Sequence, residues 1–244
     1  MNYILLAAGR GSRLHPLTLN TPKSMYKLDK NTTILQRMIK KIKKYDDKSK
    51  IIIVTGFKRN LIESQVFEKH LEEIIFLNNP FYNITNSIAS LWFAKEYLID
   101  SDVTIINADI VMQDELIRDI VCKTNEKPFV LLDSSIKQNG DYNVQVKNER
   151  VLVMSKQLEN YFGEYAGVTK LDVHSALKLY KKVCSMIENE AYDQWYENCL
   201  IQMIFNEDFE LFYEDISKFK WTEVDCVEDM LLAKEIHLSE KNEI

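Results

Sequence analysis

Apolar runs and helical patterns alternate along the first half of the chain. Four runs carry no polar face, which is typical of strands buried on both sides of a parallel sheet. These runs cover residues 3–7, 51–55, 74–77 and 103–109. Between them, apolar residues recur at helical spacing over residues 34–42, 60–69 and 88–97. This order predicts a parallel sheet with right-handed helical crossovers.

The pattern turns to strands after Pro128. Strands are predicted at residues 129–132, 142–146 and 151–154, with Asn148 and Glu149 in a turn. The pattern therefore predicts a hairpin extension laid over the edge of the sheet. A last strand at 219–225 and helices at 115–121, 175–187 and 227–237 complete the predicted elements.

Length and charge narrow the class of protein. The 244 residues predict one α/β domain over 1–244, a Rossmann-like, mostly parallel twisted sheet with helices on both faces. A net charge of −6 argues against a broad nucleic-acid surface. No apolar run approaches the ~20 residues that span a bilayer, so we expect no membrane contact and a cytoplasmic location. The scattered cysteines and histidines predict no zinc site.

A glycine-containing loop follows the first strand, with the sequence Ala8-Gly9-Arg10-Gly11-Ser12-Arg13. Small residues let backbone N–H groups approach an anion, and basic side chains follow at once. Leu14 occupies the third-glycine position of a dinucleotide fingerprint, and Gly11 lacks the Lys-Ser/Thr of a Walker A loop. The loop instead avoids helix through Pro22 and then brings in Lys23. This arrangement predicts a loop that folds over a nucleoside triphosphate.

The stretch Leu6-Ala7-Ala8-Gly9-x-Gly11-x-Arg13-Leu14, followed by Pro16-Leu17-Thr18 and Pro22-Lys23, resembles the signature of the nucleotidyltransferases that make nucleotide-activated sugars and alcohols. The chain looks closest to the small, phosphocholine-type cytidylyltransferases. The resemblance implies a GT-A-like fold with a nucleotide-binding half at about 1–112 and an acceptor-binding half at about 113–244. It implies nucleotide binding by Leu6, Ala7, Ala8, Gly9, Gly11, Ser12, Arg13, Lys23, Gly56, Asn86, Ser87 and Ser90.

The fourth predicted strand ends in the carboxylate of Asp109. A charge at the tip of a central strand is costly unless a cation meets it, and Mg²⁺ prefers carboxylate and phosphate oxygens. The family carries Asp-x-Asp here, whereas this chain has Asn107 at the first position. The resemblance implies that Asp225 returns to the same Mg²⁺, with Glu223 and Glu228 as alternatives. The alternative for Asp109 is a cap of the helix at 115–121.

Asn86 and Ser87 stand before the helical pattern at 88–97. Either residue suits an N-cap. Their place at the carboxyl edge of the sheet also suits contact with a nucleotide base, because Asn and Ser can satisfy a pyrimidine edge. The similarity to cytidylyltransferases favours base recognition, with Ser90 nearby, and both interpretations stay open.

The acceptor site is expected in the second half of the chain. The segment 192–198 interleaves aromatic and acidic residues, which suits a cationic or amine-bearing ligand, although such stripes also form cores. The resemblance implies that the predicted hairpin is a lid, that Lys156 after it binds the acceptor phosphate unless it is merely exposed, and that 163–168 is a strand lining the pocket. The expected acceptor-binding residues are Tyr82, Lys156, Glu164, Asp193, Trp195 and Tyr196.

These features predict a Mg²⁺-dependent cytidylyltransferase that acts on CTP and a small phosphorylated acceptor. Arg13, Lys23 and Asp109 are the expected catalytic residues, and no side-chain nucleophile is needed. Phosphocholine, phosphoethanolamine, aminoethylphosphonate and phosphoglutamine all suit the acceptor site, with surface polysaccharide decoration as the expected purpose and a homodimer possible. The alternatives are a sugar-1-phosphate nucleotidyltransferase using UTP, dTTP or GTP, and an inactive nucleotide-binding regulator. Asp109 and Asp225 in separate regions, with Lys23 remote, would contradict the prediction.

Overall fold

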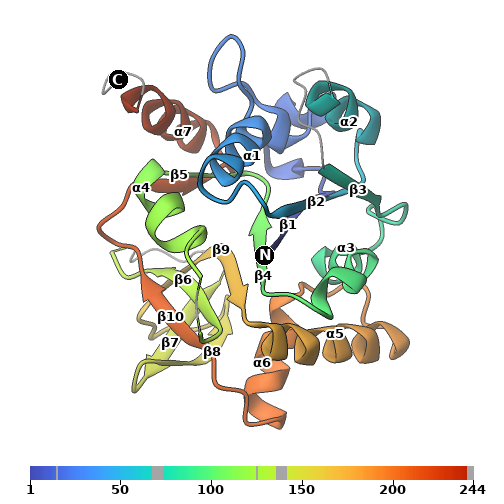
Figure 1. Cartoon of the computed structure of the whole chain (residues 1–244), viewed down its shortest axis with the longest axis vertical. Coiled ribbons are helices and arrows are strands. Elements are labelled where there is room, and N and C mark those ends of the chain that lie inside the picture. The colour runs from blue at the N-terminus through green and yellow to red at the C-terminus, as the bar shows by residue number, and fades with distance from the viewer. Residues whose placement is uncertain (15, 68–73, 125, 136–141, 241–244) are drawn as a thin grey trace.

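The structure is a computed structural model that describes residues 1–14, 16–67, 74–124, 126–135 and 142–240. Within these residues, nine strands form one sheet in the order β3-β2-β1-β4-β9-β6-β10-β8-β7 (Figure 1). The strands are β1 (Asn2–Ala7), β2 (Lys50–Thr55), β3 (Ile74–Asn78), β4 (Val103–Asn107), β6 (Phe129–Asp133), β7 (Asn143–Lys147), β8 (Arg150–Ser155), β9 (Gly163–Leu171) and β10 (Phe212–Asp215).

The first half of the sheet is parallel, as the sequence predicted. Strand β1 pairs with β2 on one side and β4 on the other, and β2 pairs with β3, all in parallel. Parallel strands need crossover connections, and the apolar runs between turn signals supply buried strands of the right length. The carboxyl ends of β1, β3 and β4 therefore open at one edge of the sheet.

The second half of the sheet is mostly antiparallel. Strand β9 pairs antiparallel with β4, β6 and β7, and β8 pairs antiparallel with β7 and β10, whereas β10 and β6 are parallel. The α/β fold is confirmed, and the sheet as a whole is mixed because the chain adds hairpins instead of crossovers after β6. The predicted hairpin is β7–β8, and its register with β9 makes it part of the sheet. Its role as a lid stays a prediction.

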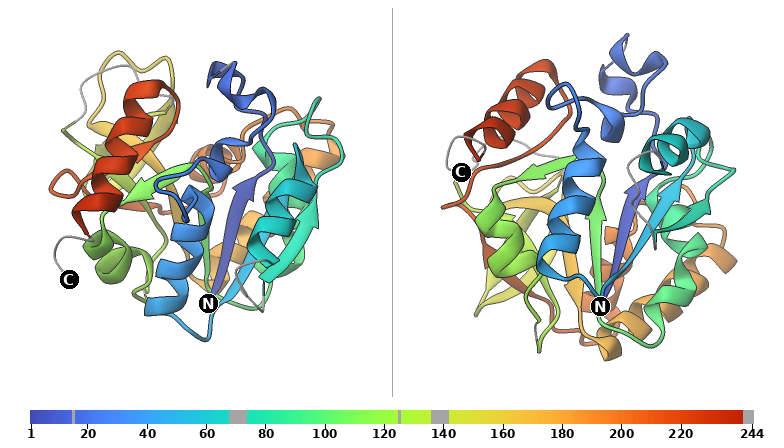
Figure 2. Two further views of the ribbon diagram at one scale, coloured as in Figure 1. Left: turned by 90° about the horizontal axis from the view of Figure 1, so that it is seen from above. Right: turned by 45° about the horizontal axis from the view of Figure 1, so that its top comes forward.

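Helices cover both faces of the sheet (Figure 2). Alternate residues of β1 belong to two different hydrophobic cores. Tyr3 and Leu5 pack with the helices of one face, and Ile4 packs with those of the other. The first face carries α1 (Ile34–Tyr45), α2 (Arg59–Phe67) and α4 (Asp114–Leu116), which continues as a π-helical turn (Ile117–Val121). The second face carries α3 (Ser87–Phe93), α5 (Val173–Glu188) and α6 (Glu197–Asn206).

A short antiparallel ribbon joins the last strand of the chain to the region after β4. Strand β5 (Ile110–Met112) pairs with β11 (Trp221–Glu223), and helix α7 (Val227–Ser239) follows. The backbone N–H of Val224 donates to the carbonyl of Asp109 at 3.1 Å. This ribbon therefore brings the predicted strand-end carboxylates of the two halves together.

Four short 3₁₀ turns complete the described elements, at Ser12–Leu14, Leu17–Leu19, Lys23–Met25 and Lys95–Leu98. The first three occupy the long loop after β1, which the sequence predicted to avoid α-helix. The predicted helix at 60–69 is observed to Phe67, and its last two residues lie outside the described ranges. Among the described helices, none combines the length and apolar character needed to cross a bilayer.

Candidate active site

A cleft of about 330 Å³ opens at the carboxyl edge of the parallel strands. This edge is where open α/β sheets bind ligands, because loops from neighbouring strands face each other there. The cleft is lined by Leu6, Ala7, Ala8, Gly9, Gly11, Arg13, Pro22, Lys23, Ser24, Asn79, Tyr82, Thr85, Asn86, Ser87, Ser90, Asn107, Ala108, Asp109, Tyr142, Tyr165, Trp195, Glu197 and Glu223. Most of the predicted nucleotide-binding residues thus share one cavity.

The glycine loop holds Lys23 against its backbone. Gly11 has a φ of +63°, and a Cβ built there would lie 2.7 Å from the Lys23 Cγ. The Thr18 hydroxyl donates to the Gly11 carbonyl at 2.7 Å, which fixes the loop behind this contact. A Cβ at Gly9 would instead meet no atom within 4 Å. Gly11 is therefore required by the fold, whereas Gly9 leaves room beside the backbone for a ligand.

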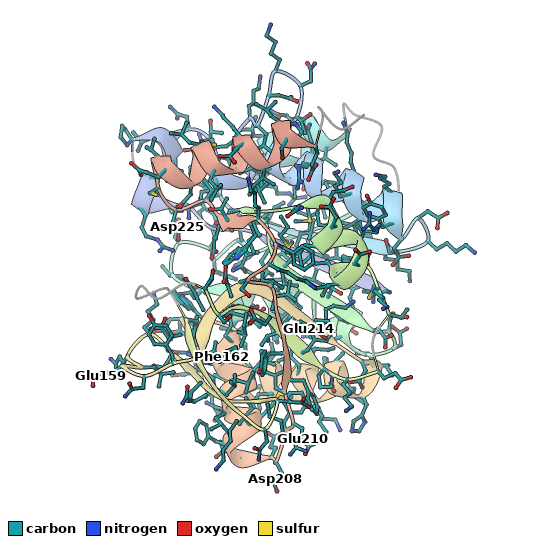
Figure 3. All side chains as sticks on the ribbon, turned by 90° about the vertical axis from the view of Figure 1, so that its left-hand side faces the viewer. Glu159, Phe162, Asp208, Glu210, Glu214 and Asp225 are labelled. Atoms are coloured by element: carbon teal, nitrogen blue, oxygen red, sulfur yellow. The ribbon has the colours of Figure 1, made fainter. Side chains whose placement is uncertain are left out.

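Four charged side chains converge beside this loop. The Lys23 ammonium forms ion pairs with Asp225 and, at 3.4 Å, with Oδ2 of Asp109. Arg13 Nη1 lies 2.9 Å from Oδ2 of Asp225. The sequence predicted that Asp109 and Asp225 meet beside Lys23, and the structure brings all of these residues together. Figure 3 shows Asp225 beside helix α7, apart from Phe162 and Glu214 in the antiparallel part of the sheet.

Burial and the neighbouring charges together shift the pKa values of Asp109 and Lys23. Burial raises the pKa of Asp109, and the Asp225 carboxylate adds to the rise although Lys23 opposes it. Burial lowers the pKa of Lys23, but Asp109 and Asp225 outweigh that effect, so this pKa is raised overall. The carboxylates therefore need a cation at this point, and Lys23 supplies one.

Asp109 lies in the turn between β4 and β5 and does not cap a helix. Helix α4 begins at Asp114, with Gln113 at its N-cap position. Asn107, at the first position of the family's Asp-x-Asp, donates to Glu223 Oε1 at 3.3 Å. Glu223 therefore lines the cleft next to Asp109.

The part of the cleft where the sequence predicted contact with a base lies at the start of α3. Asn86 is the N-cap residue, and its Oδ1 accepts from the Ser87 N–H at 2.8 Å. The Ser87 hydroxyl accepts from the backbone N–H of Tyr196 at 2.9 Å. Both residues also line the cleft, as does Ser90, so the capping role is confirmed and base contact remains sterically open.

Three predicted acceptor-binding residues gather in an adjoining cavity of about 310 Å³. Lys156 Nζ lies 4.0 Å from the centroid of the Trp195 ring, and Asp193 lines the same cavity. The Tyr142 and Trp195 ring centroids are 4.8 Å apart. Asn86, Tyr142 and Trp195 line both cavities. A ligand in the first cavity can therefore extend into the second.

Three predicted contacts lie elsewhere. Tyr196 is fully buried, and its hydroxyl is 2.6 Å from that of Tyr165, so it is a core residue and not an acceptor contact. Gly56 lines neither cavity. A Cβ at this position would lie 2.8 Å from the Tyr82 Cβ and 2.9 Å from the Ala8 carbonyl oxygen. Gly56 therefore allows these two segments to pack closely. Glu164 in β9 faces Asn143 of β7 and lines neither cavity.

The side chain of Ser12 lies outside the described part of the chain. The backbone there forms a 3₁₀ turn that closes with a bond from the Leu14 N–H to the Gly11 carbonyl at 3.1 Å.

The sequence did not point to several residues that line the cleft. Asn79 is 1% exposed and Glu197 is 4% exposed. Asn79 directly follows the third predicted strand, which was a usable signal. Glu197 belongs to the aromatic and acidic segment at 192–198, but helix α6, which it starts, was not predicted, so the sequence analysis did not select its carboxylate. Pro22, Ser24, Thr85, Ala108, Tyr142 and Tyr165 were missed as well.

The profile of the nucleotidyl transferase family matches residues 2–140. This stretch is more than half of the 244 residues and contains Arg13, Lys23 and Asp109. The chain belongs to this family. It is therefore a nucleotidyltransferase, and the predicted fold class and family are confirmed.

Cytidylyltransferases are among the relatives of this nucleotidyltransferase. It is 30% identical over 140 residues to a CTP:phosphoglutamine cytidylyltransferase of Campylobacter jejuni, an alignment covering 55% of this chain and 53% of that protein. It is 27% identical over 242 residues to a choline-phosphate cytidylyltransferase of Streptococcus pneumoniae, covering 97% and 98% of the two chains. A bifunctional protein GlmU of Methanocaldococcus jannaschii is 28% identical over 192 residues, covering 77% of this chain and 42% of that protein.

Solved structures show the same fold at lower identity. A CTP:phosphocholine cytidylyltransferase from Streptococcus pneumoniae has a TM-score of 0.77 at 20% identity, covering 97% of this chain and 98% of that one. A UDP-glucose pyrophosphorylase has a TM-score of 0.75 at 11% identity, covering 98% of each chain.

Proposed function

We propose that this nucleotidyltransferase transfers CMP from CTP to a small phosphorylated or phosphonate acceptor that carries an amine, and that pyrophosphate leaves. The convergence of Arg13, Lys23, Asp109 and Asp225 beside the glycine loop carries the proposal. The cytidylyltransferases among its relatives, which act on phosphoglutamine and on choline phosphate, support the choice of CTP and of the acceptor class.

The donor end binds the triphosphate. The open side of Gly9 admits a phosphate to the loop backbone, and Arg13 and Lys23 are the cations next to it. Cations beside the β- and γ-phosphates stabilise the charge that develops on departing pyrophosphate. Asn86, Ser87 and Ser90 line the part of the cleft that receives the base.

The residues present fit a divalent cation. The Asp109 and Asp225 carboxylates approach one ammonium, so they can approach one metal ion, and their oxygens are ligands that Mg²⁺ prefers. The described residues hold no group of three or more His, Cys, Asp or Glu suited to a metal, which agrees with a site completed by substrate phosphates. Bound there, Mg²⁺ would neutralise charge where the two substrates meet.

The acceptor end orients the second substrate. A phosphate oxygen of the acceptor, largely ionised at neutral pH, attacks the α-phosphorus of CTP in line. The new P–O bond replaces the bond to the β-phosphate oxygen, and pyrophosphate departs. Lys156 and Trp195 are positioned for the phosphate and the amine of the acceptor, and Asp193 and Glu197 supply negative charge. The residues act by positioning and charge, so no covalent intermediate on the protein is required.

A panel of CTP, UTP, dTTP and GTP against about a dozen phosphorylated acceptors, read as pyrophosphate release, tests the proposal. We expect release only with CTP and an amine-bearing acceptor, and only with Mg²⁺ or a similar divalent ion. Release with a sugar 1-phosphate and UTP, dTTP or GTP would contradict it. The GlmU relatives and the UDP-glucose pyrophosphorylase fold favour that second candidate. Absence of release from every pair, with nucleotide binding retained, would indicate a regulator without turnover.

We also propose that the reaction serves surface polysaccharide decoration, that the protein is cytoplasmic and that it forms a homodimer. The size of the purified protein in solution tests the last of these.

A further inference from the structure

Asn79 is a buried hub between the end of β3 and the start of α3. Its Oδ1 accepts from the Phe81 N–H at 2.9 Å. Its Nδ2 donates to the hydroxyls of Thr85 and Ser90, each at 3.1 Å. The side chain is 1% exposed and borders the cleft. The Asn79 side chain therefore makes three hydrogen bonds, and all three partners lie between residues 81 and 90.

The orientation of the Asn79 amide is fixed by chemistry. A backbone N–H can only donate, so the atom facing Phe81 must be the oxygen. The nitrogen then faces both hydroxyls and can only donate to them. The Thr85 hydroxyl in turn donates a hydrogen bond to the Phe81 carbonyl oxygen at 2.8 Å. For Ser90, no group among the described residues accepts the hydroxyl hydrogen.

The bond from the Asn79 amide nitrogen to the Ser90 oxygen decides whether the Ser90 hydroxyl donates to or accepts from a ligand. Its oxygen accepts from Asn79, so its hydrogen is left for a ligand in the cleft that Ser90 borders. Cytosine presents an acceptor at N3, whereas uracil presents an N3–H donor. A hydroxyl that donates into the cleft matches cytosine. Uracil N3–H could be met only by the remaining lone pair of the Ser90 oxygen, which would leave the hydroxyl hydrogen without an acceptor among the described residues.

We propose that Asn79 is a positioning residue for base selectivity: it holds the Ser90 hydroxyl as a hydrogen-bond donor toward N3 of cytosine and so favours CTP over UTP. This inference rests on the proposed use of CTP and adds the group that sets the preference. A site built around one hydrogen-bonding pattern rejects the base that leaves buried groups unpaired.

The substitution Asn79→Asp tests the inference because it keeps the shape and replaces the NH₂ donor by an oxygen acceptor. The Ser90 hydroxyl then donates to the new carboxylate and offers only lone pairs to the base. We expect the ratio of kcat/KM for CTP to that for UTP to fall by about tenfold to a hundredfold. Pyrophosphate release gives the ratio, and calorimetric titration of CTP and UTP without acceptor gives it independently of turnover.

Asn78→Asp is the matched control. Asn78 is the last residue of β3, lines neither cavity and receives the same change of charge one position away. It should keep the wild-type ratio. Ser90→Ala, which removes the hydroxyl and leaves Asn79 intact, should lower the ratio even if Asn79→Asp does not fold.

The outcomes separate the two proposals. If the wild type releases pyrophosphate from CTP but both Asn79→Asp and Ser90→Ala keep its CTP-to-UTP ratio within about twofold, the role of Asn79 is wrong and the proposed function stands. If the wild type shows no preference for CTP in either turnover or titration, the proposed use of CTP is wrong. The inference about Asn79, which rests on it, is then wrong as well.

Discussion

The proposed donor end and the proposed acceptor end of the cleft are built from different parts of the sheet. The donor end uses loops after the parallel strands β1, β3 and β4, together with the returning Asp225. The acceptor end uses Tyr142 before β7, Lys156 after β8, and Trp195 before α6. Backbone geometry and charge fix the first, and side chains on an antiparallel extension fix the second.

The family profile extends over the two ends to different degrees. The family profile matches residues 2–140, which contain most of the donor end. The alignment with the phosphoglutamine enzyme also covers only about half of each chain, namely 55% and 53%. The matched part of the chain thus contains β1 and its loop, whereas β7, β8 and β9 lie beyond it, so an acceptor pocket on these strands can differ between members that share the first half.

The largest effect is expected from breaking the charged cluster at the donor end. Lys23→Ala and Asp109→Asn should each lower kcat/KM by about a hundredfold to a thousandfold, because each removes charge placed at the reacting phosphates. Pyrophosphate release measures the loss, and circular dichroism checks that the variants fold. Lys220→Ala and Asp119→Asn, which alter exposed ion pairs, serve as controls. Near-normal release from both cluster variants would contradict the mechanism.

The two glycines of the loop should respond differently. Gly9→Ala places a methyl group in open space, so stability should stay unchanged while KM for CTP rises about tenfold. Gly11→Ala forces a side chain into a left-handed backbone and against Lys23, which should destabilise the fold by about 1–3 kcal/mol. Thermal unfolding and CTP titration distinguish the two. Equal loss of stability in both variants would show that Gly9 also has a structural role.

A smaller effect, confined to the acceptor, is expected at Trp195. Trp195→Leu removes the ring beneath Lys156 and beside Tyr142, so KM for the acceptor should rise about tenfold while KM for CTP changes little. Trp92→Leu is a matched control, since Lys95 lies 3.6 Å from the centroid of that ring and Trp92 lines neither cavity. A parallel rise in KM for CTP would mean that the two ends are not separable.

The smallest expected effect is a pH dependence of stability. The pKa of Asp109 is raised in the folded protein above its ordinary value of 3.8, so the folded state binds this proton more tightly than the unfolded chain. The contribution of Asp109 to stability is therefore largest below pH 3.8 and is lost as pH rises through the raised pKa. Denaturant unfolding of the wild type and of Asp109→Asn, compared between about pH 3.5 and 8, should show this difference. An opposite slope would mean that Lys23 dominates.

The sequence allowed prediction of the donor end because its signals are local. The apolar run of β1, the glycine loop and Lys23 lie within the first 25 residues, and Asp109 directly follows a buried strand. The meeting of Asp109 with Asp225 came from the family resemblance. Their separation in sequence gives no local signal, since it depends on the pairing of β5 with β11.

The short strands and the proposed acceptor end were less predictable for physical reasons. Strand β5 has three residues and β10 has four, too few for a reliable period, and both were missed. The aromatic segment at 192–198 was recognised, but the spacing of its aromatic residues did not indicate which ring faces the core. Trp195 faces the cavities, whereas the next residue, Tyr196, is buried against Tyr165. The proposed role of Asn79 depends on three hydrogen bonds that no sequence pattern encodes.

The ion pair between Lys23 and Asp225 joins residues 202 positions apart in the chain. During synthesis, the phosphate loop and Asp109 emerge long before the ribbon that delivers Asp225. A nascent chain therefore acquires its second carboxylate only when β11 has left the ribosome and paired with β5. The order of translation therefore keeps this cluster of charged side chains incomplete until Asp225 itself has been made.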